Sequence, residues 1–553
     1  MYKNLQALVE AKLISALAES LKKAIYEGEL ELEGVPEISV EQPREKEHGD
    51  YATNLAMAAA SQAGMNPRKI AEIIVDNFEG EGVEEISIAG PGFINFKLKK
   101  NWLYENLKLI NKLKDDYGKI DTGQGKRVQI EFVSANPTGP LHVGHSRGAV
   151  VGDVCASIME AAGYDVEREY YINDAGNQMD ILAESTLLRY REICGKEIKL
   201  PEDVYAGDYV IEIAEDLYQE YGRDILEEEE QKQLDICREF AYQDMLQKIK
   251  EDLNKFGIEF DNWFSERTLH PAKINEAVDV LRDKGYIYEE EAALWFKSSE
   301  FGDDKDRVVI KSDGSPTYLA ADIAYHLDKL ERGFDKLINV WGADHHGYIP
   351  RMKAVIEAFG YGRDTLEIIV VQMVNLLRNG EKMQMSKRAG SFVTMNEVNE
   401  EVGTDAARYY YIMRSTDSHL DFDLELAKEE SSNNPVYYVQ YAHARIHSII
   451  DNAEIEPDSE NLKLLSDPAE VDLMKMLASF PEEIKLSAES RQPHHLTAYA
   501  YDLATAFHAF YNNCRVNTDN NELSGARLYL VDAARQVLKN VLTLLGISAP
   551  AEM

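Results

Sequence analysis

Cysteine is scarce in this chain of 553 residues, which contains only four of them. Cys155, Cys194, Cys237 and Cys514 are far apart in the sequence, with no CxxC pair and no histidine at metal-ligand spacing. This pattern argues against a structural zinc site and against a disulfide framework. We therefore expect reduced thiols and no protein-bound metal.

Long apolar runs and a secretion signal are also missing. No stretch of about 18 apolar residues, the length of a membrane-spanning helix, occurs in the sequence. The first residues, Met1-Tyr2-Lys3-Asn4-Leu5, lack the apolar segment of a signal peptide. These absences predict a cytoplasmic protein without a membrane partner, and we expect it to be a monomer.

Basic residues are outnumbered, because 59 Lys and Arg face 98 Asp and Glu, a formal net charge of -39. Such a balance repels a polyanion at long range and argues against general nucleic-acid binding. Acidic runs such as residues 227–230 and 289–291 are typical of solvated faces that keep a protein soluble. Any RNA site must therefore be a local basic patch.

The chain is too long for one hydrophobic core and should contain about three domains. Residues 1–110 show helical periodicity at 5–26, 54–63 and 67–77, followed by two strand-like segments, as in an α+β domain. Residues 111–430 repeat a strand, a glycine-containing loop and a helix, which predicts a Rossmann-like parallel sheet covered by helices. Residues 431–553 have helical periodicity throughout and predict an all-α bundle. The expected fold is therefore α/β multidomain.

The strands of the central domain can be placed by their apolar runs. A crossover helix is expected at residues 145–162, and an acidic helical insertion at about 180–300. Strands of the sheet are expected at residues 127–133, 166–172, 308–311, 337–341 and 368–374.

The motif His142-Val143-Gly144-His145 lies between the first expected strand and its helix. A turn from strand to helix points backbone N–H groups and the helix dipole at one place, which is how many folds bind phosphate. The two histidines share a helix face and can both donate to that phosphate, while Gly144 allows a flat base to approach. Alternatively, they are a helix cap and a buried histidine.

A second polar segment, residues 381–391, contains two lysines, an arginine and a glycine. Such a loop can close over a triphosphate, with Lys387 and Arg388 neutralising charge on a leaving pyrophosphate. A solvated surface loop is the alternative. A third segment places Tyr318 and Asp322 four residues apart on a helix, a pair that suits a planar guanidinium, unless Asp322 is merely an exposed residue beside a core tyrosine.

With these three segments, the chain resembles the arginyl-tRNA synthetases of class I, nearly from end to end. Residues 131–145 resemble the first class I signature, and Met385-Ser386-Lys387-Arg388 resembles the second. The usual first lysine of the second signature is Gln384 here, so its electrostatic role is expected at Lys387, with help from Lys382. Other family-like segments are residues 48–54, 171–178, 318–322 and 544–550.

The resemblance implies an arginine–tRNA ligase that uses ATP, accompanied by Mg²⁺, to form arginyl-adenylate and pyrophosphate. Arginine would then pass to the 2′-hydroxyl of the terminal adenosine of tRNA(Arg). It further implies that residues 1–110 bind the tRNA elbow, that residues 431–553 bind the anticodon, and that tRNA must be bound before arginine is activated efficiently.

The resemblance also assigns individual residues. The catalytic residues would be His142, His145 and Lys387. The ATP-binding residues would be Pro137, Thr138, His142, Gly144, His145, Met373, Met385, Ser386 and Lys387. The arginine-binding residues would be Glu131, Ser134, Asn136, Tyr318, Asp322, Asp344 and His346, of which the last two belong to a loosely aligned segment. The tRNA-binding residues would be Tyr437, Tyr441 and Arg445, on one helical face, although each tyrosine also suits a core position.

Two other kinds of protein fit part of this pattern. Small-molecule adenylyltransferases carry HxGH on a similar sheet, but they are much shorter and lack an aromatic helical C-terminal domain. A synthetase-like RNA-binding protein without activity is the other alternative. The presence of His142, His145, Lys387, Tyr318 and Asp322 argues against it.

Overall fold

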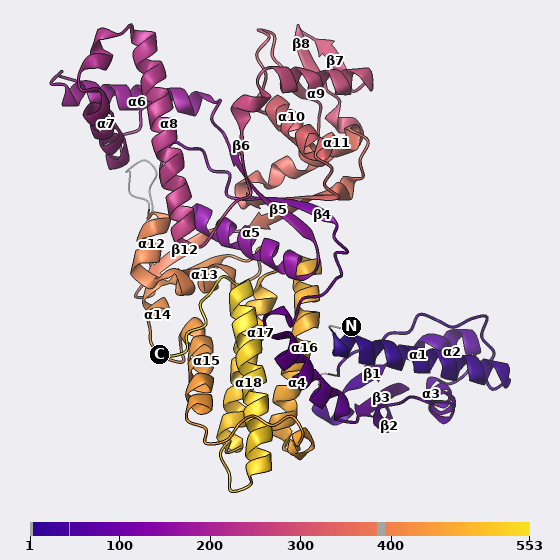
Figure 1. The fold of residues 1–553 in the computed structure, drawn as a ribbon. Coiled ribbons are helices and arrows are strands. Elements are labelled where there is room, and N and C mark those ends of the chain that lie inside the picture. The colour runs from indigo at the N-terminus through magenta and orange to yellow at the C-terminus, as the bar shows by residue number, and fades with distance from the viewer. Residues whose placement is uncertain (1–3, 44, 384–392) are drawn as a thin grey trace.

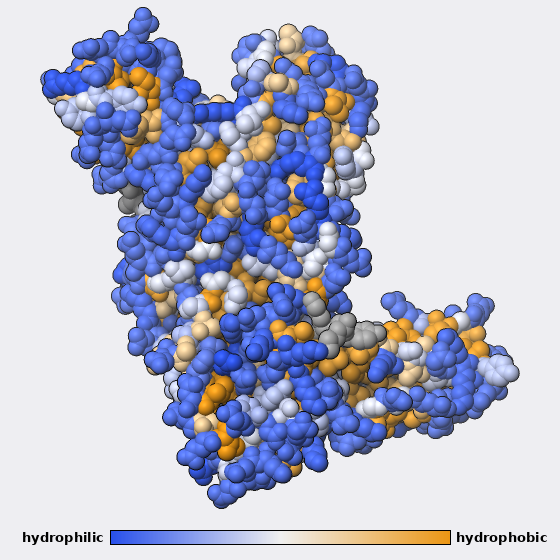
Figure 2. All heavy atoms as spheres, in the orientation of Figure 1, coloured by the Kyte–Doolittle hydropathy of each residue, from blue (hydrophilic) through white to orange (hydrophobic). Residues whose placement is uncertain are grey.

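The computed structural model describes residues 4–43, 45–383 and 393–553. Figure 1 shows a helical bundle, an N-terminal unit that projects sideways from it, and a sheet-containing body that carries two separate lobes. The face of the molecule in Figure 2 is mostly hydrophilic, in keeping with the charged composition. Within the described ranges, no helix combines the length and apolar character needed to cross a membrane.

The N-terminal unit packs helices on a three-stranded antiparallel sheet of order β1-β3-β2. Its elements are α1 (Leu5–Tyr26), β1 (Tyr51–Thr53), α2 (Leu55–Ala63), α3 (Pro67–Asp76), β2 (Val83–Ala89) and β3 (Phe93–Leu98). Leu13, Leu17 and Leu21 recur along one face of α1 and are buried with Ile94 and Phe96 of β3. The predicted helices are confirmed to within one residue at each end. Helix α4 (Asn101–Leu113) leads to the next domain.

Five parallel strands form the central sheet, in the order β11-β10-β4-β5-β6. They are β4 (Arg127–Glu131), β5 (Asp165–Ile172), β6 (Asn262–Ser265), β10 (Lys336–Gly342) and β11 (Leu366–Val371). The strand order reverses at β4, because the next strand along the chain lies on one side of it and later strands lie on the other. In open parallel sheets, ligands bind at the carboxyl ends of the strands at such a point.

The predicted strand at residues 308–311 is wrong as a member of this sheet. It forms β9, which pairs antiparallel with β8 in a separate three-stranded sheet of order β7-β8-β9. The strands of that sheet are β7 (Ile287–Glu290), β8 (Ala293–Phe296) and β9 (Arg307–Ile310). The missing strand of the parallel sheet is β6, inside the stretch 180–300 that was predicted to be helical. β6 has only four residues, too few for a recognisable alternation, and it lies between helices that end at Lys255 and begin at Ala272.

Helices cover the sheet and build the two lobes seen in Figure 1. The crossover helix is α5 (Val143–Ala161). One lobe contains α6 (Asn177–Ile193), α7 (Asp208–Tyr221) and α8 (Glu230–Lys255), and the other contains α9 (Ala272–Asp283), α10 (Tyr318–Glu331) and α11 (Ile349–Ala358). The lobes therefore flank the carboxyl ends of β4 and β5.

Below the sheet, a small connecting layer leads to the bundle. The layer contains β12 (Val374–Arg378), β13 (Glu381–Lys382), α12 (Met395–Val402), α13 (Thr404–Ile412), β14 (Leu420–Asp423) and α14 (Leu424–Ala427). The bundle contains α15 (Pro435–Asp451), α16 (Pro468–Ser490), α17 (His494–Asn513) and α18 (Asn521–Leu544). One hydrophobic core runs from the sheet through this layer into the bundle, so the two parts share buried side chains.

Candidate active site and RNA-binding surface

The carboxyl end of β4 turns sharply towards β5. The N–H of Ser134 donates to the carbonyl oxygen of Phe132 at 3.0 Å, which closes a γ-turn centred on Val133. Val133 and Ser134 have φ angles of 67° and 43°, in the left-handed region. Such a conformation costs a β-branched residue on the order of 1–3 kcal/mol, and it is concentrated at functional sites. The turn places the Ser134 hydroxyl 3.2 Å from the N–H of Tyr171, from which it accepts a hydrogen bond.

Side chains from the helical lobe hold the segment between β4 and α5. Tyr209 of α7 donates to the carbonyl oxygen of Thr138 at 2.9 Å, and Nδ2 of Asn136 donates to Oε1 of Gln178 at 2.6 Å. Pro137 is buried and Thr138 is half-buried. The insertion therefore supports the loop that contains the predicted ATP-binding residues.

His142 and His145 cap the N-terminus of α5. Nδ1 of His142 accepts from the N–H of Gly144 at 3.1 Å, and Nδ1 of His145 accepts from the N–H of His142 at 3.3 Å. A neutral imidazole whose Nδ1 accepts must carry its proton on Nε2. The cap interpretation and the phosphate interpretation are therefore compatible, because they use different nitrogens. Gly144 is exposed, and a Cβ there would lie 2.8 Å from Cε1 of His142.

The chain after residue 392 returns to the first signature. The N–H of Val143 donates to the carbonyl oxygen of Val393 at 3.1 Å. The N–H of Met395 donates to the carbonyl oxygen of Leu141 at 2.8 Å. His142 and Thr394 form an isolated antiparallel bridge between these bonds. The first signature and the chain that follows the second one are thus directly hydrogen-bonded.

The second signature itself lies outside the described residues, together with the predicted Met385, Ser386 and Lys387. The chain before it is anchored by the N–H of Met383, which donates to the carbonyl oxygen of Leu376 at 2.9 Å. The predicted ATP-binding residue Met373 joins β11 to β12 and is 59% exposed. It therefore lies after the carboxyl end of β11, and its contact with ATP stays a prediction.

Asp322 of α10 lies in a cluster of acidic side chains with Glu131 and Glu266. Tyr348 donates a hydrogen bond to its Oδ2. Burial, assisted by the charges of Glu131 and Glu266, raises the pKa of Asp322 from its usual 3.8 to about 7, although the Tyr348 hydrogen bond and the Lys329 charge oppose the rise. A guanidinium beside Asp322 would restore the ionised carboxylate, since it would supply positive charge.

The predicted partner of Asp322 was Tyr318, which begins α10 but is 69% exposed. The hydroxyl that bonds Asp322 belongs instead to Tyr348. Asp344 and His346 are exposed in the 3₁₀ turn Ala343–Tyr348 that carries this tyrosine. The turn therefore contributes Tyr348 to Asp322, a residue that was not predicted, while substrate contact by Asp344 and His346 stays a prediction.

Two further residues of this acidic cluster were not predicted. Glu266 is buried directly after β6, the strand that sequence reasoning did not find. Lys329 is fully buried, and its Nζ lies 2.6 Å from Oε2 of Glu131. A lysine between acidic neighbours on a helix resembles a solvated residue, so no local signal marks it. Lys329 balances the negative charge that was expected from Glu131. The other carboxylate oxygen of Glu131, Oε1, accepts a hydrogen bond from the Ser134 hydroxyl at 3.0 Å.

Tyr437, Tyr441 and Arg445 share one face of α15. The two tyrosine rings stack with centroids 5.9 Å apart, and the Arg445 guanidinium lies 4.7 Å from the Tyr441 ring. All three side chains are half-buried and line a cavity of about 460 Å³. They are therefore neither core residues nor freely solvated, and a stacked base would fit the character of this surface.

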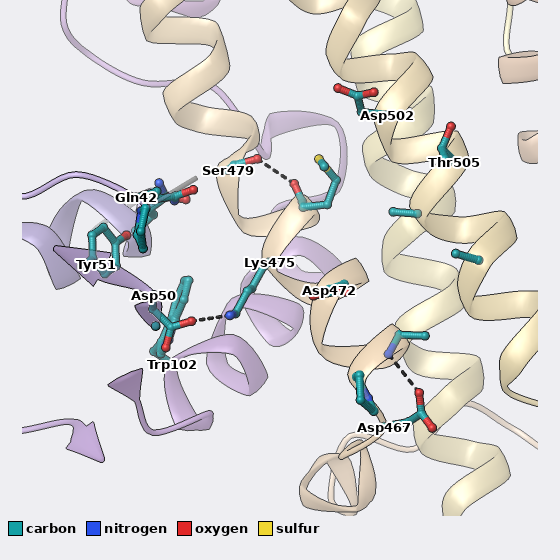
Figure 3. Close-up of a pocket in the computed structure, with 18 of the residues that line it drawn as sticks. Gln42, Asp50, Tyr51, Trp102, Asp467, Asp472, Lys475, Ser479, Asp502 and Thr505 are labelled. Carbon is teal, nitrogen blue, oxygen red and sulfur yellow. Dashed lines mark hydrogen bonds and ion pairs between the residues drawn. The ribbon is translucent and has the colours of Figure 1, made fainter. Parts of the chain in front are cut away.

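A larger cavity, of about 950 Å³, lies between the N-terminal unit and helices α16 and α17 (Figure 3). Asp50 and Lys475 form an ion pair across it. Asp467, Asp472 and Asp502 add further acidic groups to its lining. These carboxylates disfavour a polyanion in this cavity.

The four cysteines are free and buried. In the part of the chain that the structure describes, one group of side chains has ligand atoms close enough together to hold a metal ion: Glu45, Glu47 and His48 of the N-terminal unit. Exposed acidic groups of this kind are common without a metal.

Comparisons with known proteins agree with this arrangement. Three family profiles match: the arginyl tRNA synthetase N-terminal domain at residues 11–98, the catalytic domain of class I tRNA synthetases (R) at 108–446, and the DALR anticodon binding domain at 439–553. The chain is 50% identical over 554 residues to the arginine–tRNA ligase of Bacillus subtilis, covering 99% of this chain and 100% of that protein. It is 49% identical over 561 residues to that of Desulforamulus reducens, with the same coverage.

A solved structure shares the fold. The arginyl-tRNA synthetase of Thermus thermophilus matches with a TM-score of 0.77 at 24% identity, covering 98% of this chain and 100% of that one. The N-terminal unit, the parallel sheet with its two signatures and the C-terminal bundle are all accounted for by one family. The chain therefore belongs to the arginyl-tRNA synthetases of class I.

Proposed function

We propose that this chain activates L-arginine with ATP and transfers it to tRNA(Arg). A carboxylate oxygen of arginine attacks the α-phosphorus of ATP, the bond from that phosphorus to the bridging oxygen breaks, and pyrophosphate leaves. The 2′-hydroxyl of the terminal adenosine then attacks the carbonyl carbon of arginyl-adenylate, and AMP leaves. The observation that carries this proposal is the pairing of the first signature with the chain after the second, in a member of this family.

Activation needs little acid–base chemistry, because the arginine carboxylate is already ionised near neutral pH. Positioning and charge stabilisation supply the acceleration instead. The Nε2–H groups of His142 and His145 donate to the phosphates, and Lys387 stabilises the charge that moves to pyrophosphate. Mg²⁺ accompanies ATP as its counter-ion, and no resident metal is proposed. The remaining ATP contacts are assigned to Pro137, Thr138, Gly144, Met373, Met385 and Ser386.

The acidic cluster selects arginine by its planar cation. Asp322 receives the guanidinium, with Glu266 contributing negative charge nearby and Tyr348 orienting the carboxylate. Ser134 and Asn136 lie towards the backbone end of the substrate. Glu131 contributes negative charge from below the arginine site. Tyr318, Asp344 and His346 are the proposed arginine contacts at its exposed edge.

The flanking parts bind tRNA. Residues 1–110 are proposed to contact the elbow, and residues 431–553 the anticodon, through Tyr437, Tyr441 and Arg445. Residues 111–430 carry the chemistry. We further propose that the chain is a cytoplasmic monomer whose RNA contacts are confined to local patches, since its net charge is -39.

Arginine-dependent exchange between ATP and pyrophosphate, with and without tRNA(Arg), tests this function. We expect exchange that requires arginine, is stimulated by tRNA, and falls by about 10²-fold or more in Lys387→Ala. The control is Lys232→Ala, which removes an exposed lysine that pairs with Glu228 in the helical lobe. Exchange without tRNA and with another acid would favour a small-molecule adenylyltransferase. Binding of tRNA without any exchange would indicate an inactive RNA-binding protein.

A further inference from the structure

A chain of buried hydrogen bonds runs beneath the proposed arginine site, and Lys329 of α10 is at its centre. The ammonium of Lys329 donates to Oε2 of Glu131 at 2.6 Å and to Oδ1 of Asn339 at 3.0 Å. Lys329 is 0% exposed and Asn339 is 1% exposed. Groups this deeply buried depend on their protein partners, because water does not replace a lost bond.

One arm of this chain runs from Lys329 to the guanidinium end of the site. Because Oδ1 of Asn339 faces the ammonium, its Nδ2 faces Nε2 of His326, at 3.2 Å. Burial lowers the pKa of His326 to about 3, so the ring is neutral. A ring whose Nε2 accepts carries its proton on Nδ1, which donates to the carbonyl oxygen of Asp322 at 2.8 Å.

The other arm runs from Lys329 to the backbone end of the site. Oε1 of Glu131 accepts from the hydroxyl of Ser134 at 3.0 Å, and the Ser134 oxygen accepts in turn from the N–H of Tyr171 at 3.2 Å. An ammonium can only donate, so Lys329 fixes the orientation of the Asn339 amide and, through it, the tautomer of His326. In the other arm Lys329 holds the Glu131 carboxylate, and that carboxylate accepts the proton of Ser134.

We propose that Lys329 is a positioning residue for arginine recognition, which holds Ser134 through Glu131 at one end of the site and the turn that carries Asp322 at the other. This inference rests on the proposed function of Asp322 in guanidinium binding. Lys329 itself lies below the site and contacts the substrate only through these residues. A merely structural ion pair would affect stability, and would affect arginine and ATP alike.

The charge of Lys329 gives a second way to test the positioning role, because it affects the ionisation of Asp322. The groups that face Asp322 are Glu131 from β4, Glu266 from the turn after β6, Tyr348 from the 3₁₀ turn before α11, and Lys329 from its own helix. Tyr171 of β5 faces the same carboxylates. In this set Lys329 is the cation. Its removal would leave the carboxylates uncompensated, so Asp322 would ionise, and bind arginine, only at higher pH.

The test uses the full-length chain and arginine-dependent pyrophosphate exchange at saturating tRNA, from about pH 6 to about pH 9. For Lys329→Met at neutral pH, we expect the KM for arginine to rise by about tenfold or more. We expect the KM for ATP to change by less than about twofold, because Lys329 does not hold any of the proposed ATP-binding residues. The defect in arginine KM should shrink towards high pH, and Lys329→Arg, which keeps the charge, should restore the wild-type pH midpoint.

A second variant covers the case in which Lys329→Met does not fold. Asn339→Leu breaks the arm towards His326 and leaves the ion pair of Lys329 with Glu131 in place. It should raise the KM for arginine by about threefold without moving the pH midpoint. The matched control is Lys336→Met on the same strand, because Lys336 donates to the carbonyl oxygen of Asp364 at 2.7 Å, at the opposite end of β10. It should leave both KM values unchanged.

An unchanged arginine KM in the folded variants, or equal rises in the KM for arginine and for ATP, would overturn the proposal. Asp322→Ala in the same assay separates this result from failure of the site. If Asp322→Ala leaves the arginine KM unaltered, the guanidinium site itself is wrongly assigned. If Asp322→Ala raises it and neither Lys329→Met nor Asn339→Leu does, only the positioning role is wrong.

Discussion

The imidazole rings of His142 and His145 stack with their centroids 3.9 Å apart at the N-terminus of α5. Each Nδ1 accepts a main-chain N–H of the helix cap, which leaves the ring proton on Nε2. Capping stabilises the fold, whereas the Nε2–H groups are proposed to stabilise the transition state. Because the two roles use different nitrogens, substitution can separate them.

Three substitutions of His145 make this separation. Asparagine places an acceptor near the position of Nδ1, so His145→Asn should keep the thermal stability and lower kcat by about 10²-fold. Glutamine places a donor near the position of Nε2, so His145→Gln should keep more of kcat and lose about 1 kcal/mol of stability. His145→Ala should lose both. Exchange kinetics and thermal unfolding measure the two effects, and an unchanged kcat in His145→Ala would remove the phosphate role.

Arginine binding should depend on pH through Asp322. Burial raises the pKa of this carboxyl to about 7, and only its ionised form attracts a guanidinium. The KM for arginine should therefore rise below pH 7, by up to about tenfold per pH unit, while the KM for ATP should not follow it. The isosteric Asp322→Asn should have a uniformly high arginine KM and no such midpoint. A wild-type arginine KM that is flat between pH 5 and 8 would contradict this assignment.

The same carboxyl should make the fold less stable at neutral pH than a neutral side chain would. With a raised pKa, the folded chain holds this proton more tightly than the unfolded chain does, so stability is lost as pH rises from about 4 to about 7. Asp322→Asn should therefore melt at a higher temperature than wild type at pH 8, by about 2 °C or more. The difference should shrink at pH 5. Thermal unfolding at the two pH values checks it, and a lower melting temperature for the variant at pH 8 would refute it.

Arg445 offers a test of the RNA surface. Its guanidinium lies 4.7 Å from the ring of Tyr441 and 5.2 Å from that of Tyr511, which makes a cationic stacking surface. Arg445→Ala should raise the KM for tRNA by about tenfold and leave the KM for arginine and ATP unchanged at saturating tRNA. Arg535→Ala on α18, whose guanidinium pairs with Asp532, is the control. Equal effects of the two variants would mean that Arg445 contributes only general charge.

The ion pair of Lys475 with Asp50 joins α16 to the N-terminal unit. Because Lys475 is half-exposed, Lys475→Met should cost at most about 1 kcal/mol of stability. It should raise the KM for tRNA by about threefold, because the ion pair helps to orient the N-terminal unit, which is proposed to bind the tRNA elbow. The control is Lys232→Met, which removes an exposed lysine of α8 whose Nζ lies 2.6 Å from Glu228. Aminoacylation at varied tRNA measures the effect, and identical tRNA KM values in the two variants would argue against it.

The local elements and part of the candidate site can be predicted from the sequence alone. The helix at Leu5–Tyr26 and the strand-to-helix turn before His145 follow from periodicity, capping and glycine placement, which act between near neighbours. His142 and Asp322 could be identified for the same reason, since each belongs to a short pattern with a recognisable spacing. The domain order followed from changes in that periodicity along the chain.

Which distant segments meet depends on the three-dimensional fold. β6 belongs to the parallel sheet because Tyr170 pairs with Trp263 across it, and four residues carry no pattern that reveals this. Lys329 and Tyr348 resemble surface residues until the fold buries one and turns the other to Asp322. Hydrogen bonds and charge shifts of this kind depend on separation in space, and separation along the chain does not specify it.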